Sequence, residues 1–271
     1  MGTRNYNLGT RDLGDAGRRA LDTAASRGDI GYSTAATVAD RWRVFADAAR
    51  AEGVGRMERI DRDLVMRWGQ RLAEMVGCGE VSAAYGQVLL SAINTVMLLV
   101  RPGWTPVRPV ADCGIARRDT VRRTPPPDRA SYDQAVDALR AQGHERVAAV
   151  VVLARELGLR RREASLINAR AALRQAKAGR IRVALGTKGG RPRDVRITDE
   201  RQIEALRVAA AAQGSDRSMV PTGTTWAQWR DGELRRASAT VAEIAGCRGL
   251  HDLRAAYACE RYEAIAGAPA P

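Results

Sequence analysis

The sequence predicts a mainly α-helical protein with two domains and one small β-hairpin. Apolar residues recur at three- and four-residue intervals over most of the 271 residues, which is the period of an amphipathic helix. One pair of alternating segments, 180–185 and 194–198, flanks Gly189-Gly190 and predicts the hairpin. An Arg- and Pro-rich stretch, 116–129, separates two helical regions, each long enough to bury its own core.

The first region is predicted to contain an N-terminal arm, 1–32, and a helical domain, 33–113. The arm is rich in Gly and Arg, with a short helix around 15–26. The domain has three apolar stripes at helical spacing, which indicate core packing rather than cofactor contacts. Their members are Val38, Trp42, Phe45 and Ala49; Leu64, Val65, Trp68, Leu72 and Met75; and Tyr85, Val88, Leu89, Ala92, Ile93, Val96 and Val100.

End signals delimit these three helices. Ser33 or Thr34 is expected to cap the first, which ends at Gly53. The second begins at about Asp61, and Pro102 closes the third.

A linker, 114–128, leads into a second domain, 129–271. Consecutive prolines in the linker favour extended backbone, and arginines flank them. Around the hairpin, helices are expected at 131–142, 145–157, 199–212, 226–238 and 251–266.

The charge of the chain favours a polyanionic partner. There are 44 basic and 31 acidic residues, and the net charge is +13. Such an excess on a globular chain suggests nucleic acid, although a well-solvated basic surface is the simpler alternative. Only Lys177 and Lys188 are lysines, which a GC-rich genome explains, so a retained lysine is informative.

Scarce residues exclude several kinds of site. The two histidines and four cysteines form no CxxC, CxxH or HxxxH pair, so no metal is expected. No phosphate-binding loop, dinucleotide fingerprint or GxSxG turn is present, so no cofactor is expected. The longest apolar-rich stretch, 88–100, is too short to cross a bilayer. These observations predict a cytoplasmic protein without a membrane partner.

Three segments of the second domain carry candidate chemistry: GLRRRE at 158–163, TKGGRPRDV at 187–195 and HDLRAAYA at 251–258. In this order they resemble the GLRxxE, KGxxxRxVPL and HxLRHxFA motifs of the tyrosine recombinases, the phage-integrase family. The third motif is most similar to integrases of integrative mobile elements. The resemblance implies a helical core-binding (SAM-like) domain followed by a catalytic domain of the DNA breaking-rejoining fold.

The resemblance also implies roles for individual residues. Arg160 and Arg254 would clamp the scissile phosphate, because a guanidinium binds two phosphate oxygens in a forked geometry. His251 would add a donor or a proton shuttle, and Lys188 would protonate the departing 5′ oxygen. Glu163 would orient Arg160 by an ion pair. The further basic residues predicted to contact DNA are Arg191, Arg193, Arg117, Arg118, Arg122 and Arg123.

Each candidate has a simpler explanation. The arginines at 160–162 are also consistent with a basic helix start, and Lys188 with a solubilising hairpin tip. A lone histidine such as His251 is structural more often than not. The linker arginines fit a solvated spacer equally well.

The family's nucleophile, a tyrosine well beyond the HxxR arginine, has no counterpart at that spacing. Tyr257 takes the aromatic position of the motif, and Tyr262 follows on the same helix. We therefore expect a recombinase truncated before its nucleophile, which binds DNA without cleaving or joining it. Ala255 is a second departure, because the family usually has His or Arg there.

The leading hypothesis is site-specific DNA recombination or integration through a 3′-phosphotyrosine, by a homotetramer on double-stranded DNA in the nucleoid. The alternative is a non-catalytic duplex-DNA-binding protein derived from a recombinase. A type IB topoisomerase fits the chain length and hairpin less well. An RNA-binding helical protein has little support, since aromatic residues make up only 4% of the chain.

Overall fold

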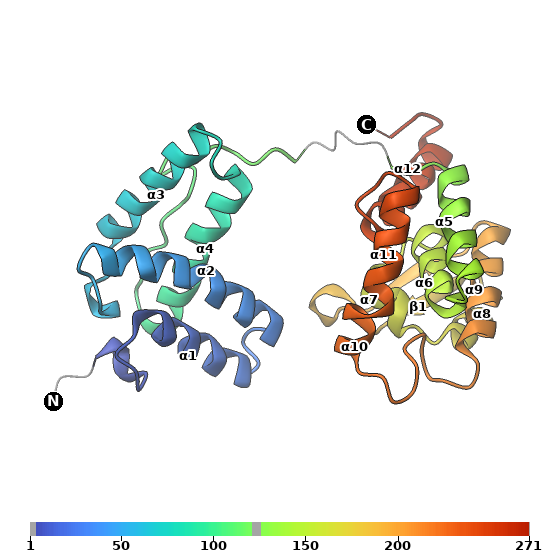
Figure 1. The fold of residues 1–271 in the computed structure, drawn as a ribbon, viewed down its shortest axis with the longest axis horizontal. Coiled ribbons are helices and arrows are strands. Elements are labelled where there is room, and N and C mark those ends of the chain that lie inside the picture. Colours follow the sequence, from blue (N-terminus) through green and yellow to red (C-terminus); the bar gives the residue numbers. More distant parts are fainter. Residues whose placement is uncertain (1–3, 121–125, 271) are drawn as a thin grey trace. The chain divides into compact units, whose positions relative to one another are not determined.

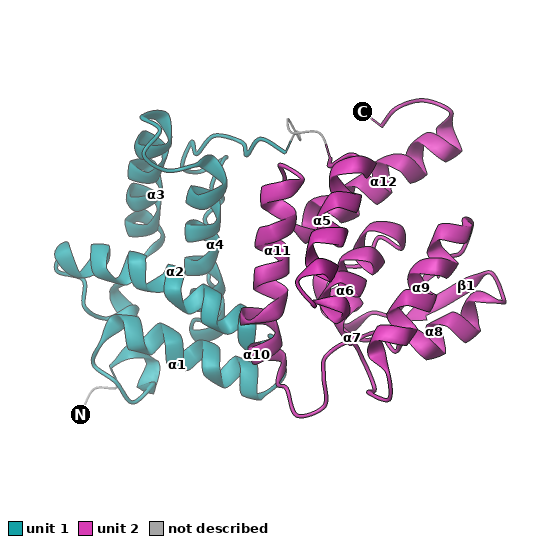
Figure 2. Cartoon of the chain, turned by 45° about the vertical axis from the view of Figure 1, so that its right-hand side comes forward, with its two compact units in different colours: residues 1–121 teal, residues 122–271 magenta. Residues whose placement is uncertain are grey.

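The computed structural model of the chain describes residues 4–120 and 126–270, and it contains two compact units, 1–121 and 122–271 (Figure 1; Figure 2). Each unit has its own hydrophobic core. The boundary between them falls within the Arg- and Pro-rich linker. Arg122 and Arg123 of that linker lie outside the described residues.

The first unit is a helical bundle. Helix α1 lies along α2, and α4 packs against α1, α2 and α3. The rings of Trp42, Phe45 and Trp68 form a continuous series at its centre, with centroids 5.5 and 5.3 Å apart. The elements are η1 (Asn5–Asn7), α1 (Leu13–Ser26), α2 (Tyr32–Ala51), η2 (Met57–Arg59), α3 (Arg62–Gly77) and α4 (Ala83–Val100).

The N-terminal residues do not form the separate arm that the sequence suggested. Leu13 and Leu21 of α1 are buried in the same core as α2. The indole N–H of Trp42 donates to the carbonyl of Leu13 at 2.9 Å. Gly17 permits this contact, because a Cβ there would lie 2.1 Å from Nε1 of Trp42. Helix α1 is therefore an integral part of the first unit.

Two local expectations for the first unit are wrong. The N-cap of α2 is Gly31, without a side-chain cap, rather than Ser33 or Thr34. Met75 and Tyr85 are 38% and 44% exposed, although they continue the apolar stripes. Both lie near an end of their helix, where the periodicity continues but the packing against neighbouring helices does not.

Helix α4 is both long and apolar. All 18 of its residues form a window of mean hydropathy 1.6, so in the described part of the chain one helix could span a membrane by length and composition. The expectation that the longest apolar stretch, 88–100, is too short to cross a bilayer is wrong by length and composition, because the apolar helix begins at Ala83. A core helix has the same composition, and Leu89, Leu90, Ile93, Val96 and Met97 of α4 are buried in the first unit's core.

The second unit is built around helix α6, whose residues 147–154 are all buried. Helix α6 packs against α5, α7, α9, α11 and α12. The elements of this unit are α5 (Arg129–Ala141), α6 (Glu145–Glu156), α7 (Arg161–Leu166), α8 (Ala169–Ala176), β1 (Arg180–Val183), η3 (Lys188–Gly190), β2 (Arg193–Arg196), α9 (Glu200–Gln213), α10 (Trp226–Asp231), α11 (Glu233–Ile244) and α12 (Leu250–Ala266) (Figure 1).

The structure confirms the mainly α-helical class and the hairpin. Strands β1 and β2 are antiparallel, with Ile181 opposite Val195, and both side chains are buried. The helix expected at 226–238 is instead two helices, α10 and α11. The break is at Gly232, where a Cβ would lie 2.7 Å from the carbonyl oxygen of Gln228. Helix α8 was not among the predicted helices, and α7 was indicated only by the basic helix start at 160–162.

We predict that Gly17→Ala destabilises the first unit, because the added methyl group collides with the buried Trp42 indole. The expected loss is about 1–3 kcal/mol of unfolding free energy, as for other overpacked cores. Hydrogen exchange of α1 and α2 amides in the full chain measures it. The control is Gly77→Ala at the open end of α3, where nothing lies within 4 Å of the new Cβ. Equal protection in both variants would contradict the packing described for α1.

Candidate active site

The segment that joins α6 to α7 turns at Gly158. This residue has φ +59°, a left-handed conformation that ends a helix and favours glycine. Leu157 and Leu159 on either side of it are fully buried. Arg160 follows as the N-cap residue of α7. The turn thus places Arg160 beside the C-terminal end of α6.

The carboxylate of Glu163 on α7 pairs with three arginines of this region. Its side chain is 0% exposed. Oε2 accepts the backbone N–H of Arg160 at 2.8 Å, and Oε1 accepts Nη1 of Arg160 at 2.7 Å. Nη2 of Arg193 on β2 donates to Oε2 at 2.7 Å. Nη1 of Arg254 on α12 lies 3.9 Å from the same oxygen. We call these three arginines with Glu163 the arginine cluster.

Electrostatics keeps Glu163 ionised. Burial alone would raise the pKa of its carboxyl group, but hydrogen bonds from Arg193 and from the backbone and side chain of Arg160 outweigh burial and lower the pKa to about 2. Burial lowers the pKa of Arg254, and the positive charges of Arg193 and Arg160 lower it further. The three cations therefore repel one another, and Glu163 is the anion that offsets this repulsion.

The three arginines form hydrogen bonds within the protein but remain partly accessible to solvent. Arg254 donates through Nη1 to the carbonyl oxygen of Gly158, which also accepts Nη2 of Arg193 at 3.2 Å. The side chains of Arg160, Arg193 and Arg254 remain 41%, 31% and 30% exposed. Convergent, partly exposed guanidinium groups of this kind can bind an anion that has several oxygens, such as a phosphate.

Two glycines allow the surrounding elements to approach α7 closely. A Cβ on Gly158 would lie 2.3 Å from the ring of Tyr257, so α12 packs directly on this turn. A Cβ on Gly186 would lie 2.7 Å from the backbone of Arg162 and 2.8 Å from the amide nitrogen of Glu163. The loop between the strands therefore rests on the backbone of α7.

Lys188 lies within the loop between the strands, and His251 lies near the N-terminal end of α12. Lys188 begins the short turn η3 in the loop that Gly186 anchors, and it is exposed. His251 lies in the first turn of α12, also exposed, three residues before Arg254. Neither side chain forms a hydrogen bond or ion pair with another described residue. In residues 4–120 and 126–270 no group of three or more His, Cys, Asp or Glu could hold a metal ion.

Five of the six further residues predicted to contact DNA lie outside the arginine cluster or outside the described residues. Arg191 is exposed in the loop between the strands, and Arg117 and Arg118 are exposed in the segment after α4. Arg122 and Arg123 lie outside the described residues.

Arg193 is the residue whose place the sequence interpretation missed. It joins the arginine cluster, whereas the sequence predicts it only as a DNA contact. Strand periodicity could have shown this, because Arg193 shares a strand face with the buried Val195.

Glu163→Gln is expected to lower stability at pH 7 and to flatten its pH dependence. The folded-state pKa of about 2 lies below the ordinary value of 4.5, so the stabilisation is complete above pH 4.5 and is lost as the pH falls toward 2. It amounts to about 3 kcal/mol at pH 7. Urea unfolding at pH values from 2 to 7 measures it, with Glu204→Gln on the exposed face of α9 as control. The same pH dependence in both variants would show that Glu163 does not stabilise the fold as an anion.

Comparisons with known proteins identify the family and the fold of the chain. The family model described as "Integrase" matches residues 118–260, more than half of the chain. No curated protein sequence matches the chain. The XerH site-specific recombinase, bound to palindromic difH substrate in a post-cleavage complex, is 14% identical over 94% of this chain and 74% of its own, with a TM-score of 0.57. The Tn1549 transposon integrase, in complex with transposon right end DNA, is 12% identical over 93% and 87%, with a TM-score of 0.57.

At these identities the solved structures show the fold, and the family model shows the family. Both confirm the resemblance read from the GLRxxE, hairpin and HxLR segments. The chain belongs to the integrase family and has the tyrosine recombinase fold.

Proposed function

We propose that the arginine cluster is the phosphate-binding site of a site-specific DNA recombinase, with Arg160 and Arg254 on the scissile phosphate. Family and fold support site-specific recombination as the function. One observation carries the assignment of residues: guanidinium groups that are far apart in the sequence converge on the buried Glu163 and stay partly exposed.

The proposed chemistry follows from the charge of a phosphodiester under attack. As the phosphorus becomes five-coordinate, negative charge grows on its non-bridging oxygens. Donors already in place stabilise that charge without reorganisation. Glu163 fixes the orientation of Arg160, and the Gly158 carbonyl fixes that of Arg254. Both guanidinium groups are therefore oriented before DNA arrives.

Lys188 and His251 are the proposed proton-handling groups. Lys188 would donate a proton to the departing 5′ oxygen, and the loop that carries it is anchored to α7 through Gly186. His251, one turn before Arg254 on α12, would donate to a phosphate oxygen or move a proton.

We infer that this 271-residue chain binds duplex DNA and does not itself cleave it. The ring of Tyr257 lies against Gly158, and Tyr262 is 46% exposed farther along α12. Neither has the spacing from Arg254 that the family's nucleophile has.

The proposed partner is double-stranded DNA, bound by four copies of the chain during recombination. The proposed setting is an integrative mobile element, with the protein acting at the nucleoid in the cytoplasm. The net charge of +13 supports a DNA partner.

Binding to a duplex selected by the chain from a random library is expected to weaken steeply with salt. Each phosphate contact contributes about −0.9 to the slope of log affinity against log salt. Arg254→Ala and Arg160→Ala should each remove one phosphate contact and so make this slope less negative by about 0.9. The control is Arg207→Ala on α9, which removes the same charge from a side chain paired with Glu204. Fluorescence anisotropy measures all four proteins. Equal slopes for the Arg254 and Arg207 variants would refute the phosphate site.

A nicked duplex of the selected sequence should form no covalent adduct with this chain. The reason is that no tyrosine of α12 has the nucleophile's spacing. Denaturing electrophoresis of the reaction is the measurement. An adduct that disappears in Tyr257→Phe or Tyr262→Phe would identify a nucleophile and overturn the inference of inactivity.

A further inference from the structure

We propose that Arg155 and Arg129 are positioning residues that act through Glu260: they anchor α12 and so hold Arg254 at the phosphate site. The inference rests on the proposed function, in which Arg254 binds phosphate. The three residues with Glu156 form a second ion cluster, which we call the α12 anchor.

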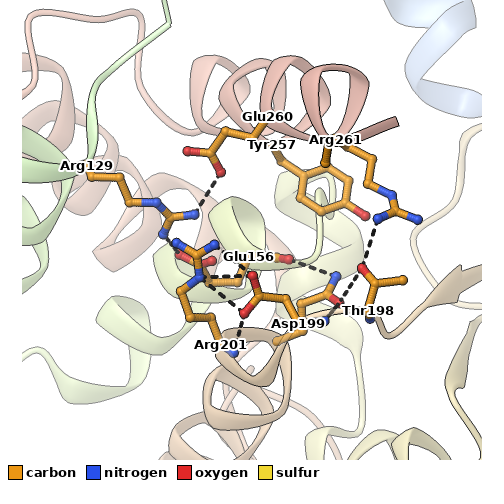
Figure 3. Close-up of a pocket in the computed structure, with 10 residues that line it drawn as sticks. Arg129, Glu156, Thr198, Asp199, Arg201, Tyr257, Glu260 and Arg261 are labelled. Carbon is orange, nitrogen blue, oxygen red and sulfur yellow. Dashed lines mark hydrogen bonds and ion pairs between the residues drawn. The ribbon is translucent and has the colours of Figure 1, made fainter. Parts of the chain in front are cut away.

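The α12 anchor joins three helices. Glu260 of α12 accepts Nη1 of Arg155 at 2.9 Å through Oε2, and Nη2 of Arg155 through Oε1. Arg129, the first residue of α5, donates to Oε2 of Glu260 at 2.7 Å and to Oε1 of Glu156 at 2.6 Å (Figure 3). Glu156 ends α6, two residues before Gly158. The anchor thus connects α12 to the end of the helix that leads into the arginine cluster.

Burial distinguishes the two arginines. The side chain of Arg155 is 2% exposed, and its guanidinium lies 5.7 Å from the centre of the Tyr132 ring. Arg129 is 31% exposed and borders a pocket of about 100 Å³ that Tyr257 and Glu260 also line (Figure 3). Arg155 is therefore the inner, water-excluded partner of Glu260, and Arg129 is the outer one. A buried ion pair typically adds little stability over an apolar pair but demands a defined geometry.

The contacts of α12 repeat at one-turn intervals. Arg254 bonds the Gly158 carbonyl, Tyr257 packs on the same glycine, and Glu260 pairs with Arg155. Residues three apart lie on one face of a helix, so this face is fixed to the end of α6 at three successive turns. Removing the contact of Glu260 weakens the attachment of the C-terminal half of α12, which Arg261 also holds through a hydrogen bond to Thr198 at 3.0 Å. The proposal is that the less firmly attached helix no longer holds Arg254 in position.

A double-mutant cycle in DNA binding tests the inference. The probe is labelled duplex DNA selected by the wild-type chain. Glu260→Gln is compared with Glu263→Gln, an exposed position on the same helix, so both variants gain the same charge. We expect Glu260→Gln to bind about tenfold more weakly than Glu263→Gln, as for directly coupled residues. In an Arg254→Ala background the two variants should bind equally.

The outcomes distinguish a specific loss of the positioning of Arg254 from a general loss of protein stability. A loss of binding that is the same with and without Arg254 would mean general destabilisation and would overturn the proposal, as would no loss at all. If the wild-type chain binds no duplex DNA, the proposed function fails. Hydrogen exchange of the amides at 250–258 then tests whether Glu260 anchors α12. Faster exchange in Glu260→Gln than in Glu263→Gln supports it, and equal exchange overturns it.

Discussion

The buried carboxylate of Glu163 is the interaction on which the second unit's site depends. Three guanidinium groups crowded together in a partly dehydrated region repel one another strongly, because the local dielectric constant is low. Glu163 lies at their centre with a depressed pKa, so its negative charge persists wherever the protein is folded at neutral pH. The N-cap of α7, strand β2 and helix α12 meet here because each brings one arginine to this anion.

Ion pairing with Glu163 stabilises the association of these elements, and two glycines allow their close contact. At Gly158 the ring of Tyr257 occupies the space of a side chain, and at Gly186 the backbone of α7 does so. Any other residue would push α12 or the strand loop outward and widen the distances to Glu163. The arginine cluster is thus a product of electrostatics and sterics together, and neither alone would bring Arg160, Arg193 and Arg254 to one carboxylate.

The two ion clusters of the second unit have complementary forms. In the arginine cluster one anion serves several cations, which leaves positive charge directed toward solvent. In the α12 anchor two glutamates pair with two arginines, so the charges balance. Helix α12 takes part in both clusters, through Arg254 and Glu260. A helix fixed by a charge-balanced ion cluster presents a cation to solvent with little loss of entropy on binding.

The helical class, the hairpin and the family could be predicted from the sequence, because periodicity and short motifs are local properties of the chain. The resemblance also implied the pairing of Arg160 with Glu163, and their RxxE spacing of one helical turn is consistent with it. That Arg193 and Arg254 share this carboxylate is visible only in the folded structure. The folded structure also shows that α1 belongs to the core and that Gly232 divides a helix. These outcomes depend on which surfaces remain unpaired once the helices pack. No local pattern records the packing of residues as far apart as Arg160 and Arg254, which are separated by 94 positions.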